Sequence, residues 1–197
     1  MKKLMMVSLA GIATIGIAAC GSSSSSATAD SSGNSGSTTT AASTDSSGGT
    51  PFSASAFTTV VPDGWTDQTQ NSQVVTAATN SGESQNLLLF TPSGSGHIDV
   101  SIPTSPVPDA SIPAYLASAA NHGATNVSDP TSFTLGSATG QYVTYDNDQS
   151  GTTFKSEDMV INEGSTTYEI IYIVPSDSFD SQMPALQSIL SSWKWTA

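Results

Sequence analysis

The sequence predicts an α+β fold, in which helices pack on a twisted antiparallel β-sheet. Short runs of β-branched and aromatic residues recur along residues 52–197, and two further stretches have the apolar spacing of amphipathic helices. Short polar loops separate several of the runs, at 80–82, 147–151 and 162–165, and each contains glycine. Because loops this short join antiparallel neighbours, the runs on either side of 147–151 and of 162–165 are expected to pair as hairpins.

The strands are predicted from segments rich in β-branched and aromatic residues. The segment at 97–102 alternates cleanly, with Ile98, Val100 and Ile102 on one face and polar residues on the other. The segment at 166–174 is β-branched or aromatic at nearly every position, which is typical of a central strand. The predicted strands are 57–61, 73–79, 86–91, 97–102, 132–135, 141–146, 152–161 and 166–174.

Two helices are predicted from apolar residues at helical spacing. The first has Ser111 as its N-terminal cap and Gly123 at its C-terminal end. The second begins near Ser181, because Pro184 is tolerated in a first turn and not in a helix interior. The resulting order is ββββαββββα. The apolar positions are Ile112, Tyr115, Leu116, Ala119 and Ala120 in the first helix, and Met183, Leu186, Leu190 and Trp193 in the second.

The chain is acidic and poor in basic residues. Its 197 residues contain four lysines, no arginine and 16 Asp or Glu, for a formal net charge of −12. Two of the lysines, Lys2 and Lys3, lie at the N-terminus. Nucleic-acid binding and electrostatic binding to anionic lipid both need clustered basic residues, so the composition argues against both. The single cysteine, Cys20, excludes an intrachain disulfide and a Cys-rich zinc site.

The N-terminus has the features of a bacterial lipoprotein signal peptide at residues 1–19. Lys2 and Lys3 precede an apolar run at 4–19, which is shorter than the roughly 20 residues that a membrane-spanning helix needs. Residues 17–20, Ile-Ala-Ala-Cys, resemble the lipobox of bacterial lipoproteins. The resemblance implies cleavage before Cys20 and lipid attachment to Cys20, by a diacylglyceryl group and palmitate. An ordinary cleaved signal whose site happens to end in cysteine is the alternative.

A tether and one folded domain are expected after the signal. Residues 21–50 consist only of Ser, Thr, Gly, Ala, Asp and Asn, a composition that cannot bury enough apolar surface to fold. We expect residues 20–51 to be a disordered tether that begins at the lipidated Cys20, and residues 52–197 to be a single domain. The tether is either a spacer or tolerated low-complexity sequence. The expected location is the cell membrane, on the extracytoplasmic side.

Four segments of the domain resemble a known family. The segments are 61–65 (Val-Pro-Asp-Gly-Trp), 139–143 (Thr-Gly-Gln-Tyr-Val), 167–170 (Thr-Tyr-Glu-Ile) and 186–195, which ends in Trp-Lys-Trp. Together with the order of elements, they resemble the PsbP-like domain, in particular the LpqN-type lipoproteins of actinobacteria. The resemblance implies a twisted antiparallel sheet flanked by helices, used in binding and accessory roles without shared catalysis. It transfers no functional residue, because the matching segments are packing motifs.

The two histidines of the chain are candidates for chemistry. His97, Asp99 and Ser101 alternate along one predicted strand, which places them roughly 6.5–7 Å apart, whereas a nucleophile and its base must approach within about 3 Å. A solvated polar strand face is the preferred interpretation, and a hydrolase site the alternative. His122 lies near a predicted helix C-terminus, where a capping role is favoured over a catalytic one.

Residues 146–157 match the spacing of a calcium loop. Asp146, Asp148 and Ser150 supply oxygens at positions 1, 3 and 5, Gly151 stands at position 6 and Glu157 at position 12. The flanking residues, however, read as strands and not as the helices of an EF-hand. A polar hairpin turn is therefore the preferred interpretation, and a calcium site the alternative.

The function expected from these patterns is that of a membrane-anchored module which binds a protein or another component of the cell envelope without catalysis. No G-x-S-x-G, P-loop, dinucleotide-binding or H-E-x-x-H pattern occurs, and no cofactor or metal is expected. A carrier of a small apolar or lipid-like ligand is the first alternative, and it predicts an enclosed apolar cavity between sheet and helix. An envelope hydrolase is the second. Five aromatic residues could line a ligand groove, although a core role is more common: Trp65, Tyr115, Tyr142, Trp193 and Trp195.

Overall fold

The structure is a computed structural model that describes residues 49–78 and 83–196 of the chain. The signal peptide predicted at 1–19, Cys20 and residues 21–48 of the predicted tether lie outside the described residues, as does the turn predicted at 80–82. The first described strand begins at Gly49, so the last residues assigned to the tether pair with the folded domain.

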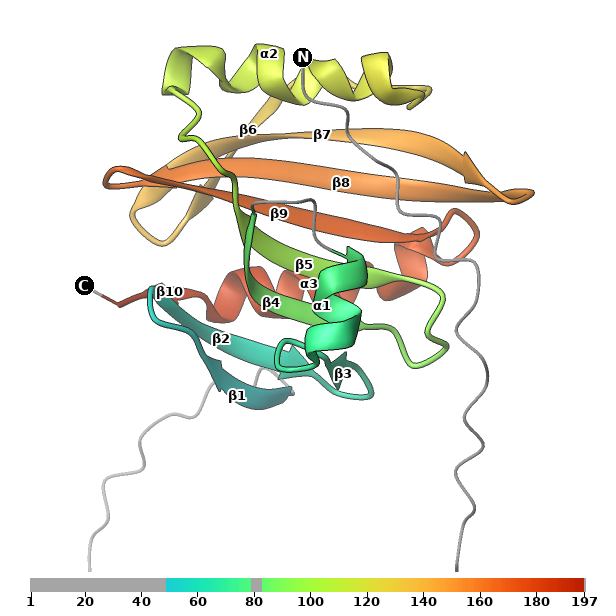
Figure 1. The fold of residues 1–197 in the computed structure, drawn as a ribbon, viewed down its shortest axis with the longest axis horizontal. Helices are drawn as coiled ribbons and strands as arrows, with labels where there is room; N and C mark the ends of the chain where they lie inside the picture. The colour runs from blue at the N-terminus through green and yellow to red at the C-terminus, as the bar shows by residue number, and fades with distance from the viewer. Residues whose placement is uncertain (1–48, 79–82, 197) are drawn as a thin grey trace, which may run out of the picture. The chain divides into compact units, whose positions relative to one another are not determined.

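Two antiparallel sheets make up the β-structure (Figure 1), which confirms the predicted α+β class. The larger sheet has seven strands in the order β3-β4-β5-β9-β8-β7-β6, and the smaller has three in the order β1-β2-β10. The strands are β1 (Gly49–Ser53), β2 (Phe57–Pro62), β3 (Thr66–Asp67), β4 (Ser84–Phe90), β5 (His97–Ile102), β6 (Thr131–Leu135), β7 (Ala138–Gln149), β8 (Thr152–Glu163), β9 (Thr166–Pro175) and β10 (Lys194–Trp195).

Three α-helices accompany the sheets in the described part of the chain: α1 (Ser72–Ala78), α2 (Ile112–Ala117) and α3 (Phe179–Ser192). Two 3-10 turns, η1 (Asp109–Ser111) and η2 (Ser118–His122), extend α2 at both ends. Figure 1 shows α2 beside β7 and α3 behind the strands β4 and β5. No helix among the described residues is long and apolar enough to cross a membrane.

Side chains on the two faces of the seven-stranded sheet belong to two separate apolar clusters. We call the first face the one whose alternating residues, such as Ile98, Met159 and Ile170, pack with α3 and the small sheet. The second face carries Val143 and Val160, which pack against Leu116 of α2. The fully buried side chains on the first face follow the strict alternation that a half-buried antiparallel strand requires.

The predicted hairpins at 147–151 and 162–165 are confirmed. β7 and β8 pair up to Gln149 and Thr152, so only two residues form the first turn, and Ser150 and Gly151 both have positive φ (51° and 85°). Positive φ at both central positions is the requirement of a type I′ turn, whose twist matches the strands on either side. The second hairpin also has a two-residue turn, with Glu163 paired to Thr166, but only Gly164 of that turn has positive φ (60°).

The strand predicted at 73–79 is wrong, because the described part of this segment forms α1. Its valines favour a strand by propensity, but Asn71 precedes them as a helix N-cap. The Asn71 side-chain Oδ1 accepts from the backbone N–H of Val74, and its carbonyl oxygen accepts from the N–H of Val75. These bonds satisfy donors that a helix start leaves without partners, so the cap outweighs the β-propensity of the valines.

The helix predicted after Ser111 is confirmed as α2 and η2, and it ends at Gly123 with φ of 92°. Ser111 stands at the N-cap position, but its side chain makes no capping hydrogen bond, so the predicted capping role is wrong. The start of α3 differs from the prediction, because the helix begins at Phe179 and not near Ser181. Pro184 therefore lies inside the helix. The N–H of Gln182 donates to the carbonyl oxygen of Ser178, so the first turn forms upstream of the proline and does not need the N–H that proline lacks.

Gly140 occupies a position in β7 where a side chain has no room. A Cβ atom there would lie 2.4 Å from the carbonyl oxygen of Val160 and 2.8 Å from Cε1 of Phe133. We expect Gly140→Ala to lower the free energy of unfolding by about 1–3 kcal/mol, because backbone or core must move to admit the methyl group. Chemical denaturation measures this, with the exposed neighbour Thr139→Ala as control. Equal stability of the two variants would contradict the close approach.

A carboxyl cluster on the second face of the sheet

Three acidic residues from three adjacent strands meet on the second face. Asp99 of β5 and Asp158 of β8 both pair with Ile171 of β9, one from each side, and Glu169 lies two residues from Ile171 along β9. Residues at neighbouring strand positions are about 4.8 Å apart, and alternate residues of a strand share a face. Asp99, Asp158 and Glu169 therefore surround Ile171 on three sides. We call them the carboxyl cluster.

Few hydrogen bonds satisfy this cluster. The phenol of Tyr115 on α2 donates to both carboxylate oxygens of Glu169, at 3.1 Å each. The side chains of Asp158 and Glu169 are within hydrogen-bonding reach of each other, so a protonated Asp158 donates to Glu169. Within the described residues, one oxygen of Asp158 and one of Asp99 are buried and have no hydrogen-bond partner. Among the described residues, Nε2 of His97 lies 4.0 Å from Oδ1 of Asp99.

Burial shifts the protonation of these groups. Loss of water around Glu169 raises its pKa to about 7, and the negative charge of Glu83 adds to this shift. Burial also raises the pKa of Asp158 and of Asp99 well above the usual range, and repulsion from Glu169 adds to both shifts. The cluster therefore holds protons near neutral pH that ordinary surface carboxyls release.

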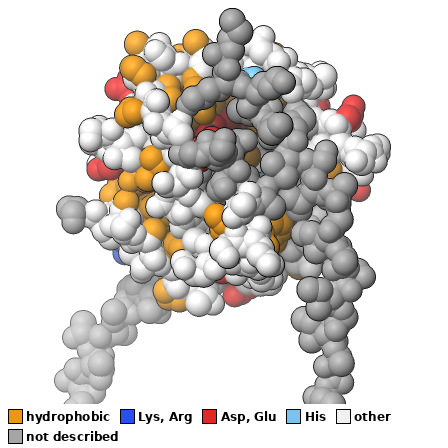
Figure 2. Space-filling view, in the orientation of Figure 1, with side chains coloured by type: hydrophobic (Ala, Val, Ile, Leu, Met, Phe, Trp, Pro, Cys, Tyr) orange, Lys and Arg blue, Asp and Glu red, His pale blue; other side chains and the backbone are white. Residues whose placement is uncertain are grey.

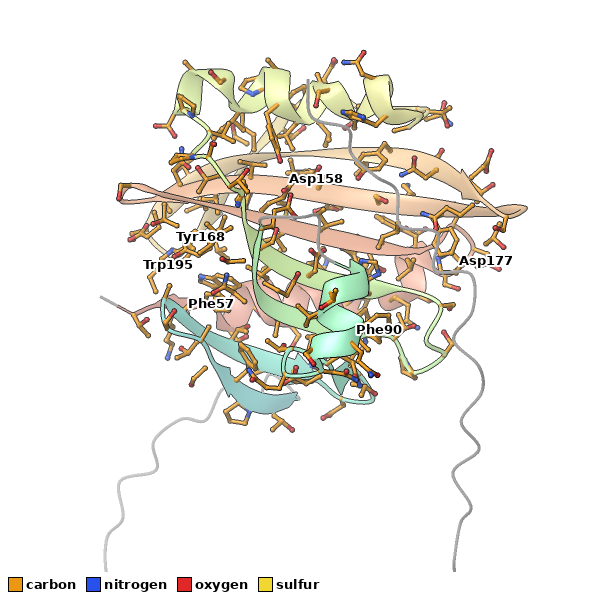
Figure 3. The ribbon with its side chains drawn as sticks, viewed as in Figure 1. Phe57, Phe90, Asp158, Tyr168, Asp177 and Trp195 are labelled. Carbon is orange, nitrogen blue, oxygen red and sulfur yellow. The ribbon has the colours of Figure 1, made fainter. Side chains whose placement is uncertain are left out.

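Neither lysine of the described part of the chain neutralises the cluster. The ammonium group of Lys155 lies 4.5 Å from the ring centroid of Phe179, which packs on the first face. Lys194 belongs to β10 in the three-stranded sheet. In Figure 3 Asp158 lies near the middle of β8, and the space-filling view in the same orientation (Figure 2) shows acidic side chains in this region.

His97, Asp99 and Ser101 do share one face, as their alternation predicts, but that face is not solvated. Ser101 is 2% exposed, and the Asp99 side chain is 14% exposed. The prediction of a solvated face is therefore wrong at these two positions. Ser101 and His97 are four positions apart on an extended strand, about 13 Å, so they do not form a nucleophile–base pair.

The calcium-loop residues serve the β7–β8 hairpin and do not converge. Asp146 Oδ2 accepts from the Asn126 amide at 2.8 Å, and Asp148 Oδ1 accepts from the Thr153 hydroxyl at 2.6 Å. Glu157 lies within β8, opposite Thr144. The described residues contain no group of three or more acidic, His or Cys side chains arranged to hold a metal ion.

The five aromatic residues do not surround one groove. Trp65 and Trp193 are buried in the first-face cluster, against which Tyr142 and Trp195 pack, whereas Tyr115 packs on the second face. The preferred core interpretation is thus supported. His122 ends η2 immediately before Gly123, which is the position that the capping prediction requires.

An open depression of about 460 Å³ lies beside the small sheet, among the described residues. Its lining combines the end of β1, including Phe52, and the first residues of the β1–β2 connection with polar side chains such as Thr69 and Gln85. The carrier alternative needs an enclosed apolar space between sheet and helix. In the described part of the chain, the layer between the sheet and α3 is instead filled by buried side chains of the first-face cluster.

Asp158 and Glu169 were not singled out from the sequence. Glu169 interrupts an otherwise apolar run, between Tyr168 and Ile170, and this is a signal that could have found it, since charged residues are rarely buried without a partner. Asp158 follows the polar residues of the first half of β8, so no such local signal marks it. Their proximity to Asp99 depends on strand order, which no local pattern reveals.

Comparison with known proteins bears on the fold. No protein-family model matches the chain, and no curated protein sequence does. Among solved structures, LpqN of Mycobacterium tuberculosis, described as involved in cell envelope biogenesis, matches with a TM-score of 0.52 and 16% identity, over 75% of this chain and 90% of that chain. The chain shares its fold with LpqN. This likeness supports the predicted PsbP-like, α+β architecture and, at such low identity, concerns the fold alone.

Two further structures match less well. Cyanobacterial PsbP from Synechocystis has a TM-score of 0.49 at 11% identity, over 75% of this chain and 92% of that chain. A Bacteroides thetaiotaomicron structure has a TM-score of 0.46 at 13% identity, over 72% of this chain, which spans 45% of the length of that chain.

Proposed function

We propose that the chain is a lipid-anchored, extracytoplasmic module of the cell envelope that binds a partner and catalyses no reaction. The observation that carries the proposal is the placement of the single cysteine, Cys20, directly after an apolar run and ahead of a domain with the fold of LpqN. LpqN is described as involved in cell envelope biogenesis, which is compatible with such a role. Cys20 would supply the anchor, and the domain the binding surface.

The arrangement of the described side chains supports a binding role over a catalytic one. The hydroxyl of Ser101 has no base within reach along its strand, and the hydroxyls of Thr59 and Ser192 bond to each other and to helix carbonyl groups. General-base catalysis of acyl transfer requires a nucleophile hydrogen-bonded to its base.

Lipid attachment at Cys20 has a direct test. When the full chain is expressed in a bacterium with lipoprotein processing, we expect mass spectrometry to find a mature chain that begins at Cys20 and carries diacylglycerol and an acyl chain. The protein should fractionate with membranes, because two or more acyl chains anchor stably. Cys20→Ala should move it to the soluble or secreted fraction, and Ser22→Ala should not. An unmodified Cys20 thiol in the membrane fraction would contradict the proposal.

The proposed partner can be sought in the same cells. Chemical cross-linking of intact cells followed by purification of the full chain should enrich an envelope protein or polymer. The Cys20→Ala variant should lose most of that enrichment, since it would no longer be held at the membrane. Equal recovery with both forms would mean that the anchor does not serve partner binding.

A further inference from the structure

A strap of the chain, residues 107–125, lies on the second face and is fixed to the sheet at both ends. At its start, the backbone N–H of Val107 donates to the hydroxyl oxygen of Thr167 at 2.8 Å. At its end, Thr125 forms a β-bridge with Asp146, and their backbone groups exchange hydrogen bonds of 2.9 and 2.8 Å. These end contacts involve no titratable side chain, so they hold the strap equally well at any pH.

The middle of the strap, α2, packs on apolar side chains and on the carboxyl group of Glu169. Leu116 packs with Val143 and Val160, and the Tyr115 hydroxyl donates to both oxygens of Glu169 at 3.1 Å each. Glu169 pairs with Val160 across β9 and β8, so its carboxyl group lies beside a residue that α2 covers. The docked helix therefore helps to exclude water from Glu169, which is 7% exposed.

A shared proton is required in the carboxyl pair beside α2. The side chains of Asp158 and Glu169 lie within hydrogen-bonding reach of each other. An ionised carboxylate only accepts hydrogen bonds, so a bond between the two groups needs a proton on one of them. Asp158 is also 7% exposed, and its Oδ1 is buried without a hydrogen-bond partner in the described structure. Without the proton, two negative charges would face each other in a place that water does not reach, which is unfavourable.

We infer that the strap is a pH-sensitive cover of the second face, in which α2 lifts from the sheet when the Asp158–Glu169 pair loses its shared proton and docks again when the pair regains it. Lifting α2 admits water to both carboxylates, which offsets their repulsion. It also uncovers Val143 and Val160, both of which are 0% exposed while α2 is docked. The protonation of one carboxyl pair thus controls the exposure of an apolar surface.

The pH range of lifting follows from the two states of Glu169. Burial raises the pKa of Glu169 from 4.5 to about 7 while α2 is docked, and access of water returns it toward the ordinary value. Between these values the docked strap retains a proton that the lifted strap releases, so a rise in pH favours lifting. Above about pH 7 both states are ionised, and the dependence on pH ends.

The other titratable groups around the pair preserve this direction. Glu83 and Asp99 are acidic, and their negative charges add to the repulsion within the pair. Burial lowers the pKa of His97 to about 4, so His97 supplies little positive charge above pH 5. Burial raises the pKa of Tyr115 and of Tyr145, and both phenols stay neutral over the same range.

This inference goes beyond the proposed function and does not depend on it, since the strap rests on the sheet whether or not Cys20 is lipidated. The two can fail separately. Membrane attachment of Cys20→Ala tests the anchor, and the pH dependence of the strap in the same purified variant tests the cover.

Hydrogen–deuterium exchange of the purified full chain in non-ionic detergent, at pH 5, 6, 7 and 8, provides the test. Rates are corrected for the intrinsic pH dependence of amide exchange. We expect the strap amides to be at least about tenfold less protected than those of β8 and β9 at each pH, because lifting α2 leaves the sheet intact. Strap protection should fall about tenfold per pH unit from pH 5 to 7, as one released proton requires, and then level off.

Substitutions assign the effect to the carboxyl pair. Glu169→Gln still accepts from Tyr115 but cannot ionise, so the fall from pH 5 to 7 should shrink to about tenfold or less. The double variant Asp158→Asn/Glu169→Gln has no titratable group in the pair and should show no fall. Asp177→Asn removes an exposed acidic residue near the end of β9 and should keep the full fall. Circular dichroism shows whether each variant is folded, and Asp158→Asn alone replaces any variant that is not.

Two outcomes would overturn the inference. Equal protection of the strap and of β8 and β9 at each pH would mean that the strap opens only when the whole domain unfolds. Strap protection that stays constant from pH 5 to 8, while that of the strands falls, would mean that the proton leaves on global unfolding and not on lifting of α2.

Discussion

Phe57→Ala should lower the free energy of unfolding by about 3–5 kcal/mol, the range for removing a fully buried aromatic ring. Phe57 is 0% exposed, and its ring stacks on Trp193 with centroids 3.9 Å apart and planes 15° from parallel. It also meets Trp195 edge to face at 6.4 Å. Figure 3 shows Phe57, Tyr168 and Trp195 close to one another beside the small sheet. One ring thus joins β2, the end of α3 and β10.

Urea denaturation followed by tryptophan fluorescence measures this effect, because Trp193 reports directly on the stacked ring. Phe154→Ala is the matched control. Phe154 is half-buried and belongs to neither apolar cluster, so its loss should cost clearly less. A similar change in both variants would mean that the aromatic stack does not anchor the C-terminus to the small sheet.

The stability of the chain should fall as the pH rises from about 4.5 to about 7, and Glu169→Gln should remove much of that fall. Burial raises the pKa of Glu169 from 4.5 to about 7, so the folded state binds a proton that the unfolded state has released within this window. A pKa shift of this size contributes about 3 kcal/mol to the free energy of unfolding. This contribution is fully present below the unfolded-state pKa and is lost as the pH rises through the folded-state pKa. Glutamine still accepts from Tyr115 but never ionises.

Other titratable groups lie around Glu169, and the direction of each pKa shift affects the expected pH dependence of stability. The raised pKa values of Asp99 and Asp158 act in the same direction, and the Asp158–Glu169 pair titrates as one unit. The pKa of His97 is lowered in the folded state, so its titration makes stability rise with pH below the unfolded-state pKa near 6.5. The fall in stability caused by Glu169 is therefore clearest above that pH. The titratable groups around Glu169 are Glu83, His97, Asp99, Tyr115, Tyr145 and Asp158.

Denaturation curves at half-unit steps from pH 4.5 to 8.5 test this prediction. Above pH 7, Glu169→Gln should be more stable than the wild type by up to about 3 kcal/mol, and the two should converge near pH 4.5. Asp177→Asn, exposed and remote from the cluster, should follow the wild type throughout. Parallel curves for Glu169→Gln and the wild type would show that Glu169 is ionised at little cost, and would remove the basis for an unsatisfied cluster.

Local sequence patterns predicted most of the strands and both hairpins, because alternation and two-residue turns depend on neighbours along the chain. They failed at α1, where the cap formed by Asn71 outweighed the strand propensity of two valines. They also predicted that the last helix begins near Ser181, whereas α3 begins at Phe179, because Pro184 is accommodated inside the helix. The β1 and β10 strands were missed because each is short and is defined only by its pairing with β2.

The amino-acid sequence alone determined the α+β class, the acidic balance and the position of Cys20 after an apolar run, because these are properties of composition and local order. Only the tertiary structure decided that Asp99, Asp158 and Glu169 share one site. Asp158 and Glu169 lie on the two strands of one hairpin, whereas Asp99 lies far away along the chain and meets them because β5 pairs with the other edge of β9. Strand order follows from how whole faces bury their apolar side chains, so no single segment encodes it.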